Sequence, residues 1–297
     1  MAKDRNKPSG SRTVERRKER GRERQRRRWL TIGIVIAALV AVVVFVFVIV
    51  NAPAAAPIPD GALTRYADVQ TTRTKDGYPR LGDPNASVQV AEYSSFDCAN
   101  CRDFHDKIID PLVDRVKGGK MALTFVPLYG FGDTPNGQGA AEASICAAEQ
   151  GKFWPFHDAL FDWQGEYGNQ AFTNNRISAG VAAFQMDQGA FSGCIASDRP
   201  GIVLNAAKAA QQHLLNFTTA PTITINGVVP LDDKQQPLTD PAAILAQIDA
   251  DIARASVPPT AEVTAEATGE ATEAATPEAT PEATATAEST PAATAAR

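Results

Sequence analysis

The sequence predicts an α/β domain with a helical insertion, preceded by one transmembrane helix and followed by a disordered tail. An alternating apolar strand, an amphipathic helix and a second apolar strand follow one another between residues 87 and 127. A long helical region without a convincing strand comes next. The composition changes at both ends of the chain, where basic and apolar blocks come first and a segment rich in Ala, Thr, Glu and Pro comes last.

The N-terminal segment, residues 1–28, is basic, with thirteen Lys and Arg against four Asp and Glu. Residues 29–50 then form a block of 22 residues without a charge. At about 1.5 Å per residue, a helix of this length crosses a hydrocarbon core of about 30 Å. The basic segment predicts a cytoplasmic N-terminus, so that the chain after residue 50 lies outside. This topological role accounts for the charge, and we do not expect nucleic-acid binding.

A cleaved signal peptide is the alternative to a retained anchor, because small residues follow the apolar block at Ala54–Ala56. Apolar cores of signal peptides run to about 7 to 15 residues, and the longer block here favours the anchor. In either case the later chain faces an oxidising space, where disulfides persist. We expect residues 51–75, rich in Ala and Pro at first, to be a linker between membrane and domain.

The domain is expected at residues 76–255, a length that supports a single hydrophobic core. Its first strand is predicted at residues 87–93, where apolar and polar residues alternate. A helix then begins near Cys98, because apolar residues recur at every fourth position: Phe104, Ile108, Leu112 and Val116. Pro111 predicts a kink in this helix.

The second strand is predicted at residues 121–127, a short apolar run. The helical insertion follows, at about residues 134–200, and a further helix is expected over residues 202–215. Asn226-Gly227 then lies between two short apolar runs, a pattern typical of a β-hairpin. The last helix is expected to begin at Asp240, with a proline in its first turn.

The C-terminal segment, residues 256–297, consists almost entirely of Ala, Thr, Glu and Pro. Such a segment has almost no apolar surface to bury and cannot offset the entropy lost on ordering. We therefore expect a disordered acidic tail. Composition leaves open whether it is a glycosylated stalk.

Cys98 and Cys101 lie where the strand pattern gives way to the helix pattern. Unpaired N–H groups and the helix dipole stabilise a thiolate at a helix N-terminus. This predicts that Cys98 is an exposed nucleophile and that Cys101, one turn later, is shielded and resolves the mixed disulfide. A zinc site is the alternative, but further ligands at suitable spacing are missing from the sequence. We expect no metal and no other cofactor.

Two neighbours of this pair carry expectations of their own. Asp97 places a carboxylate beside Cys98, and we expect its negative charge to oppose the stabilisation of a thiolate there. His105 is expected at the helix surface or partly buried, and not as a catalytic base.

Cys146 and Cys194 both fall in the helical insertion. In an oxidising compartment the simplest interpretation is a structural disulfide, which contributes about 4 kcal/mol for a loop of nearly fifty residues. The alternative is a relay that passes electrons to or from Cys98 and Cys101.

Three blocks carry a family resemblance: GYPRLGDPNASVQVAEYSSFDCANCRDFH, ICAAEQGKFWPFHDALF and TTAPTITING. In this order and spacing they resemble the DsbA-like thiol:disulfide oxidoreductases, which have the thioredoxin fold. The resemblance spans about residues 77–250. One departure is the pair Ala99-Asn100, which lacks the proline or histidine common between the family's two cysteines.

The resemblance implies a role for four residues. Cys98 is the nucleophile, Cys101 is the buried resolving cysteine, and Pro221 is a cis-proline opposite the active site. Glu92 falls where thioredoxin-like proteins carry a buried carboxylate that relays protons to the second cysteine. Ala220 and Pro221 are expected to line the substrate groove, with the Ala220 backbone pairing with an extended chain.

The expected function is that of a membrane-tethered thiol:disulfide oxidoreductase that introduces disulfides into secreted proteins. It would be a single-pass protein of the cell membrane with an extracytoplasmic catalytic domain. The expected partners are thiols of secreted or cell-surface proteins, together with a membrane quinone-linked thiol oxidase that re-oxidises the pair. Two alternatives stay open: a reductase or isomerase of the same fold, and a non-enzymatic extracellular binding module whose disulfides are all structural.

Overall fold

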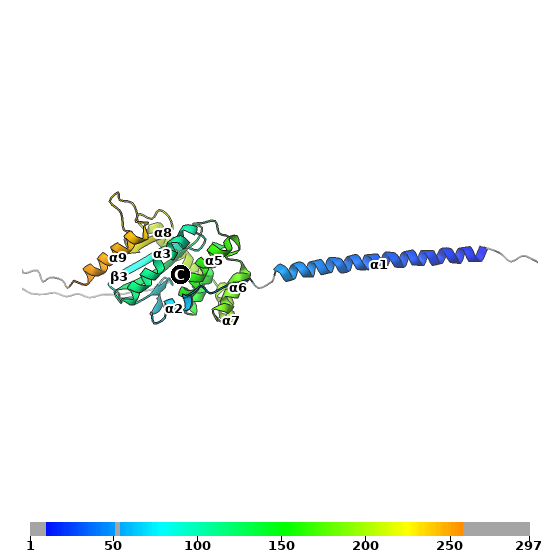
Figure 1. Cartoon of the computed structure of the whole chain (residues 1–297), viewed down its shortest axis with the longest axis horizontal. Coiled ribbons are helices and arrows are strands. Elements are labelled where there is room, and N and C mark those ends of the chain that lie inside the picture. The colour runs from blue at the N-terminus through cyan, green and yellow to red at the C-terminus, as the bar shows by residue number, and fades with distance from the viewer. Residues whose placement is uncertain (1–9, 51–53, 258–297) are drawn as a thin grey trace, which may run out of the picture. The chain divides into compact units, whose positions relative to one another are not determined.

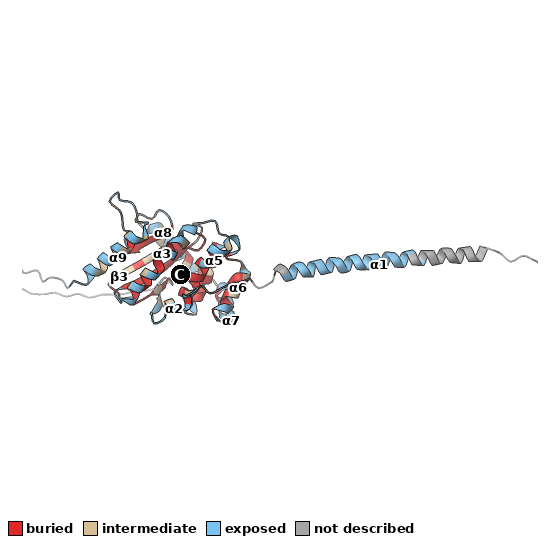
Figure 2. Ribbon diagram, in the orientation of Figure 1, coloured by how far each residue is buried: buried red, intermediate tan, exposed pale blue. Residues whose placement is uncertain are grey.

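The computed structural model describes residues 10–50 and 54–257 of the chain (Figure 1). The first helix, α1 (Gly10–Val50), contains the predicted span, and its segment Arg24–Val48 is long and apolar enough to cross a membrane. The residues of this segment are exposed (Figure 2). Membrane anchors and signal sequences both have such a helix. The expected tail, from residue 258 onward, lies outside the described residues.

The domain is built on a mixed sheet, which within residues 54–257 has the strand order β1-β2-β4-β3-β5. The strands are β1 (Thr71–Arg73), β2 (Pro79–Leu81), β3 (Val88–Ser95), β4 (Met121–Leu128) and β5 (Thr222–Ile225). Strands β3 and β4 are parallel, whereas β1, β2 and β5 pair antiparallel with their neighbours. Helix α3 (Ala99–Lys117) connects β3 to β4. This confirms the predicted order of strand, helix and strand.

The chain between β4 and β5 is the predicted helical insertion, and its described residues contain no strand. Its helices are α4 (Gly137–Glu149), α5 (Phe153–Tyr167), the short 3-10 helix η1 (Gly168–Gln170), α6 (Asn174–Ala183), α7 (Gln188–Ile195) and α8 (Arg199–His213). A disulfide between Cys146 and Cys194 joins α4 to α7, and both residues are buried. The two cysteines are thus placed as the sequence predicts, and the structural role of their bridge stays a prediction.

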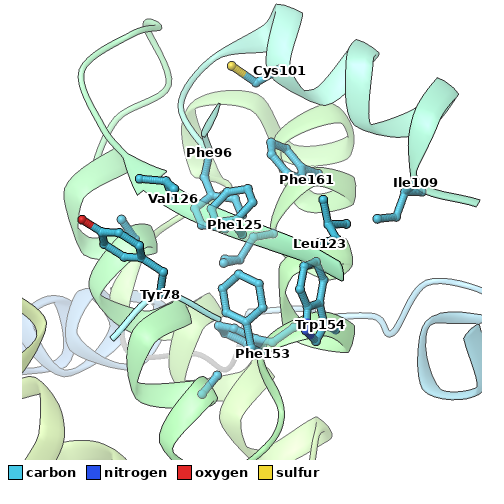
Figure 3. Close-up of a cluster of buried hydrophobic side chains, with 14 of the residues drawn as sticks. Tyr78, Phe96, Cys101, Ile109, Leu123, Phe125, Val126, Phe153, Trp154 and Phe161 are labelled. Carbon is cyan, nitrogen blue, oxygen red and sulfur yellow. The ribbon is translucent and has the colours of Figure 1, made fainter. Parts of the chain in front are cut away.

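Aromatic side chains fill the space between the sheet and helix α5 (Figure 3). The ring of Phe125 on β4 stacks on Phe96 at 5.4 Å and lies at the same distance from Phe153 of α5. Phe161 of α5 also contacts Phe96, with ring centroids 4.9 Å apart. Cys101 belongs to this same buried cluster. The second cysteine of the pair is thus part of the hydrophobic core.

The segment before the first strand belongs to the domain, and the expected linker over residues 51–75 is wrong for the part that the structure describes. Helix α2 (Ala62–Arg65) leads into Tyr66, which is buried and donates a hydrogen bond to Asp158. The indole N–H of Trp163 donates to the Pro57 carbonyl at 2.8 Å. Buried Tyr and Trp side chains need such polar partners, and this segment supplies them.

The predicted hairpin forms only its turn. Asn226 and Gly227 have φ values of 50° and 83°, as a tight two-residue turn requires. Val228 makes an isolated bridge to Ile225, and the described residues after it, up to residue 257, contain no second strand. Pro230, two residues later, has no N–H to donate to a strand ladder, so the ladder ends at this bridge.

The remaining helix boundaries agree closely with the predicted ones. Helix α9 (Pro241–Ala255) begins after Asp240, whose side chain accepts a hydrogen bond from the N–H of Ala243 at 3.1 Å. Helix α3 continues past Pro111 to Lys117. The kink expected at Pro111 stays a prediction.

Candidate functional site

Cys98 caps the N-terminus of α3 and forms a disulfide with Cys101, which lies one turn into the helix. Cys98 itself has an extended backbone, with φ −97° and ψ 114°. Its Sγ atom accepts a hydrogen bond from the backbone N–H of Cys101 at 3.1 Å. This N–H belongs to the first turn of the helix, where backbone donors lack intrahelical partners. The geometry therefore favours negative charge on the sulfur of Cys98.

Both cysteines are buried, and the expectation of an exposed Cys98 is wrong for the oxidised pair. Cys98 is 3% exposed and Cys101 is 0% exposed. The loop of residues 129–136, between β4 and α4, packs against the backbone of Asp97 and Cys98. Gly132 in this loop lies so close that an added Cβ would overlap the Asp97 carbonyl oxygen and the Cys98 Cα. The loop is distant in sequence, so local patterns could not predict the burial.

Ala220 and Pro221 lie beside Cys98, as the sequence predicts. The peptide bond between them is cis, in agreement with the family resemblance. The Sγ atom of Cys98 is 3.7 Å from the carbonyl oxygen of Ala220. Both residues line a groove of about 320 Å³, together with Asn100, Phe104, Lys107, Ile223, Leu238 and Ile244. The groove lies between α3, the residues 219–221 that lead into β5, and the start of α9.

A family model described as thioredoxin matches residues 74–250, well over half of the chain. The chain belongs to this thioredoxin family. Disulfide bond formation protein D of Bacillus subtilis (strain 168) is 24% identical over 164 residues, which cover 52% of this chain and 69% of that protein. The crystal structure of oxidised BdbD from Bacillus subtilis is similar in fold, with a TM-score of 0.50 and 20% identity. The likeness covers 63% of this chain and 99% of that one.

A third relative shares only a segment with this thioredoxin-family chain. The Na(+)/H(+) antiporter NhaA 3 of Salinispora tropica is 34% identical over 106 residues, which cover 36% of this chain and 16% of the antiporter. The antiporter's activity is therefore not carried over. With its Cys98-Cys101 pair in a thioredoxin-like fold, the chain is a DsbA-like thiol:disulfide oxidoreductase.

Glu92 is buried on the face of the sheet that helix α3 covers. Its partner on β5 is Ile223, and paired residues of neighbouring strands point to the same face. Ile223 lines the groove with Phe104 of α3 and Ile244 of α9, so this face is the one beneath those helices. Glu92 is 2% exposed, and its Oε1 atom has no hydrogen-bond partner. Burial raises the pKa of this carboxyl to about 7.

The raised pKa of Glu92 predicts a fall in stability as the pH rises. The unfolded chain releases this proton near pH 4.5, whereas the folded chain keeps it up to about pH 7. The unfolded state therefore binds fewer protons in this window, and the free energy of unfolding decreases. Because one pKa unit corresponds to about 1.4 kcal/mol, the decrease reaches about 3 kcal/mol above neutral pH.

Glu92→Gln should remove this contribution. Urea denaturation of the oxidised protein at about pH 4 and about pH 8 measures the free energy of unfolding of both chains. Between these two pH values, the difference between the variant and the natural chain should change by about 3 kcal/mol in favour of the variant. A difference that stays the same at both pH values would contradict the buried, titrating carboxyl.

Sequence reasoning missed a buried polar cluster beneath α3. His105 is 4% exposed, so its expected surface or partly buried position is wrong. Its Nε2 lies 3.5 Å from Asp158 Oδ1, and His157 Nδ1 lies 3.3 Å from the same oxygen. Burial lowers the pKa of both histidines to about 3, so they are neutral at neutral pH. The members come from distant segments, and no local pattern marks them.

The same cluster contains three groups that could hold a metal ion: His105, His157 and Asp158. However, Asp158 already forms an ion pair with Arg65 and accepts the hydroxyl of Tyr66. A divalent cation would face the Arg65 guanidinium across the same carboxylate, and this repulsion is strong away from water. The cluster is better explained as a structural network in which the ion pair of Arg65 and Asp158 links α2 to α5.

Proposed function

We propose that the protein introduces disulfides into secreted proteins and that it does so from the outer side of the cell membrane, tethered by α1. The proposal rests on the position of Cys98 at the N-terminus of α3, with the N–H of Cys101 3.1 Å from its sulfur. This environment stabilises the thiolate and hence the reduced pair. A pair whose reduced form is stabilised is a strong oxidant.

In the proposed reaction, a substrate thiolate attacks Sγ of Cys98, and the bond to Cys101 breaks. Cys101 leaves as a thiolate and takes up a proton, for which Glu92 is the proposed relay. A second substrate thiolate then attacks the substrate sulfur of the mixed disulfide and releases the Cys98 thiolate. The substrate is oxidised to a disulfide, and the pair is left reduced, with Cys98 as the thiolate and Cys101 as the thiol.

The proposed substrate site is the groove beside Cys98. Ala220 and Pro221 stand at its rim, and the Ala220 backbone is placed to pair with an extended chain. An unfolded substrate can offer such an extended segment. The reduced pair needs a second partner to regain its disulfide, and a membrane quinone-linked thiol oxidase would meet the tethered domain at the same membrane.

The direction of electron flow is tested by the midpoint potential of the pair in glutathione buffers. Known pairs of this spacing range from about −270 to about −120 mV, and we expect a value near the oxidising end. The oxidised protein should also form disulfides in a reduced, unfolded ribonuclease. A potential near the reducing end would favour the reductase. A pair that fails to react with thiols after mild reduction would favour the binding module.

The proposed topology predicts how intact cells respond to protease once their wall is removed. Protease should remove the folded domain, because it lies outside, and should leave the basic N-terminal segment protected. Immunoblotting with separate tags at the two ends measures both outcomes. Recovery of a soluble protein that begins just after the apolar helix would instead show cleavage of a signal sequence.

A further inference from the structure

Asp97 is only 5% exposed, and its carboxylate points to the loop of residues 129–136. Its Oδ2 atom accepts the N–H of Gly130 at 2.6 Å, and its Oδ1 atom accepts the N–H of Phe131 at 3.3 Å. The hydroxyl of Ser95 donates to Oδ1 as well. The main chain adds a further bond, from the N–H of Thr134 to the Asp97 carbonyl at 3.3 Å. Four donors thus converge on the residue that precedes Cys98.

Two glycines allow the loop to approach this closely. A Cβ at Gly132 would overlap the Asp97 carbonyl oxygen and the Cys98 Cα. A Cβ at Gly137, the first residue of α4, would overlap the Asp97 carboxylate. Because real side chains do not tolerate such contacts, the close seating of this loop on Asp97 and Cys98 requires glycine at both positions.

The loop also contacts the segment that carries Ala220. The ring of Phe131 packs edge-on against Phe217 at 5.8 Å, and Phe217 packs against Tyr93 of β3 at 6.4 Å. Phe217 lies a few residues before Ala220, whose carbonyl oxygen faces the Cys98 sulfur. The hydrogen bonds of Asp97 therefore support the loop of residues 129–136 directly. Through Phe131 they also support the segment 217–220 beside Cys98.

We propose that Asp97 is a positioning residue that holds the loop of residues 129–136 across Cys98 and so limits access to its sulfur. Substrate then reaches Cys98 from the side of the Ala220 groove, where the loop does not cover it. The inference rests on the proposed role of Cys98 as the reacting sulfur. It also revises the expectation that the negative charge of Asp97 opposes the stabilisation of a thiolate at Cys98, because backbone and hydroxyl donors bind to that carboxylate.

The two roles of Asp97 differ in how alkylation of Cys98 depends on pH. The test uses Cys101→Ser chains with the Cys146–Cys194 disulfide intact and iodoacetamide as the probe. Asp97→Asn replaces one of the two accepting oxygens with an amide donor, which would then face the N–H of Gly130 or of Phe131, so the loop should be released. The limiting rate at high pH should rise about tenfold, the factor that corresponds to one hydrogen bond to a charged acceptor. A purely electrostatic role would lower the midpoint pH and leave the limiting rate unchanged.

Gly132→Ala is the independent second variant, because it displaces the loop without changing any charge. It should raise the limiting rate as Asp97→Asn does. Asp133→Asn and Gly201→Ala are the matched controls: Asp133 is an exposed carboxylate of the same loop, and a Cβ at Gly201 meets no atom within 4 Å. Both should alkylate like the parent. A shifted midpoint with an unchanged limiting rate, or a Gly132→Ala chain identical to the parent, overturns the positioning role of Asp97. A parent whose Cys98 never reacts overturns the proposed function itself.

Discussion

Replacing Cys101 with Ser is expected to trap Cys98 in mixed disulfides with substrate proteins, whereas replacing Cys98 with Ser should abolish disulfide exchange. Cys98 has the helix N-terminus and a hydrogen bond to its sulfur, while Cys101 is 0% exposed within the core. The first sulfur is thus the better thiolate, and the second is placed to resolve the intermediate. Non-reducing gels of cell extracts, followed by mass spectrometry of the captured proteins, measure the two outcomes.

The control for this experiment is the chain with both cysteines replaced, which should capture nothing. Reversed behaviour, in which Cys98→Ser captures substrates and Cys101→Ser does not, would show that the roles are exchanged. Because Cys98 itself is only 3% exposed when the pair is oxidised, its reaction also depends on access from the side of the Ala220 groove.

Replacing Cys146 and Cys194 together with Ala is expected to lower the free energy of unfolding by about 4 kcal/mol. Their disulfide joins α4 to α7 across a sequence separation of 48 residues, and its removal frees a long loop in the unfolded chain. Disulfide exchange at Cys98 should persist, because we assign this bridge a structural role. Urea denaturation and the oxidation of reduced ribonuclease measure the two quantities.

A relay role for Cys146 and Cys194 makes a different forecast. Activity would be lost while the fold and the Cys98-Cys101 disulfide stay intact. Both residues are buried, at 0% and 1% exposed, which leaves neither sulfur free to meet a partner protein without opening of the insertion. The structural role is therefore the better supported of the two.

The elements near the cysteines could be predicted because their signals are local. Alternation in β3 and the four-residue spacing of Phe104, Ile108 and Leu112 follow from which faces of a strand and a helix are buried. The capping position of Cys98 follows from where one period replaces the other. The N-terminal apolar helix is likewise a matter of length and composition, and it is present as predicted.

The sequence by itself determined the order of strand, helix and strand, the helical insertion and the redox pair, since each depends on neighbours in the chain. Only the tertiary structure decided where the domain begins, because Tyr66 and Asp158 become partners across 92 positions of sequence. It also decided that Cys98 is buried and that the Asp97 carboxylate accepts hydrogen bonds from the loop of residues 129–136. Burial and hydrogen-bond partners of this kind come from segments that only folding brings together, and no local periodicity records them.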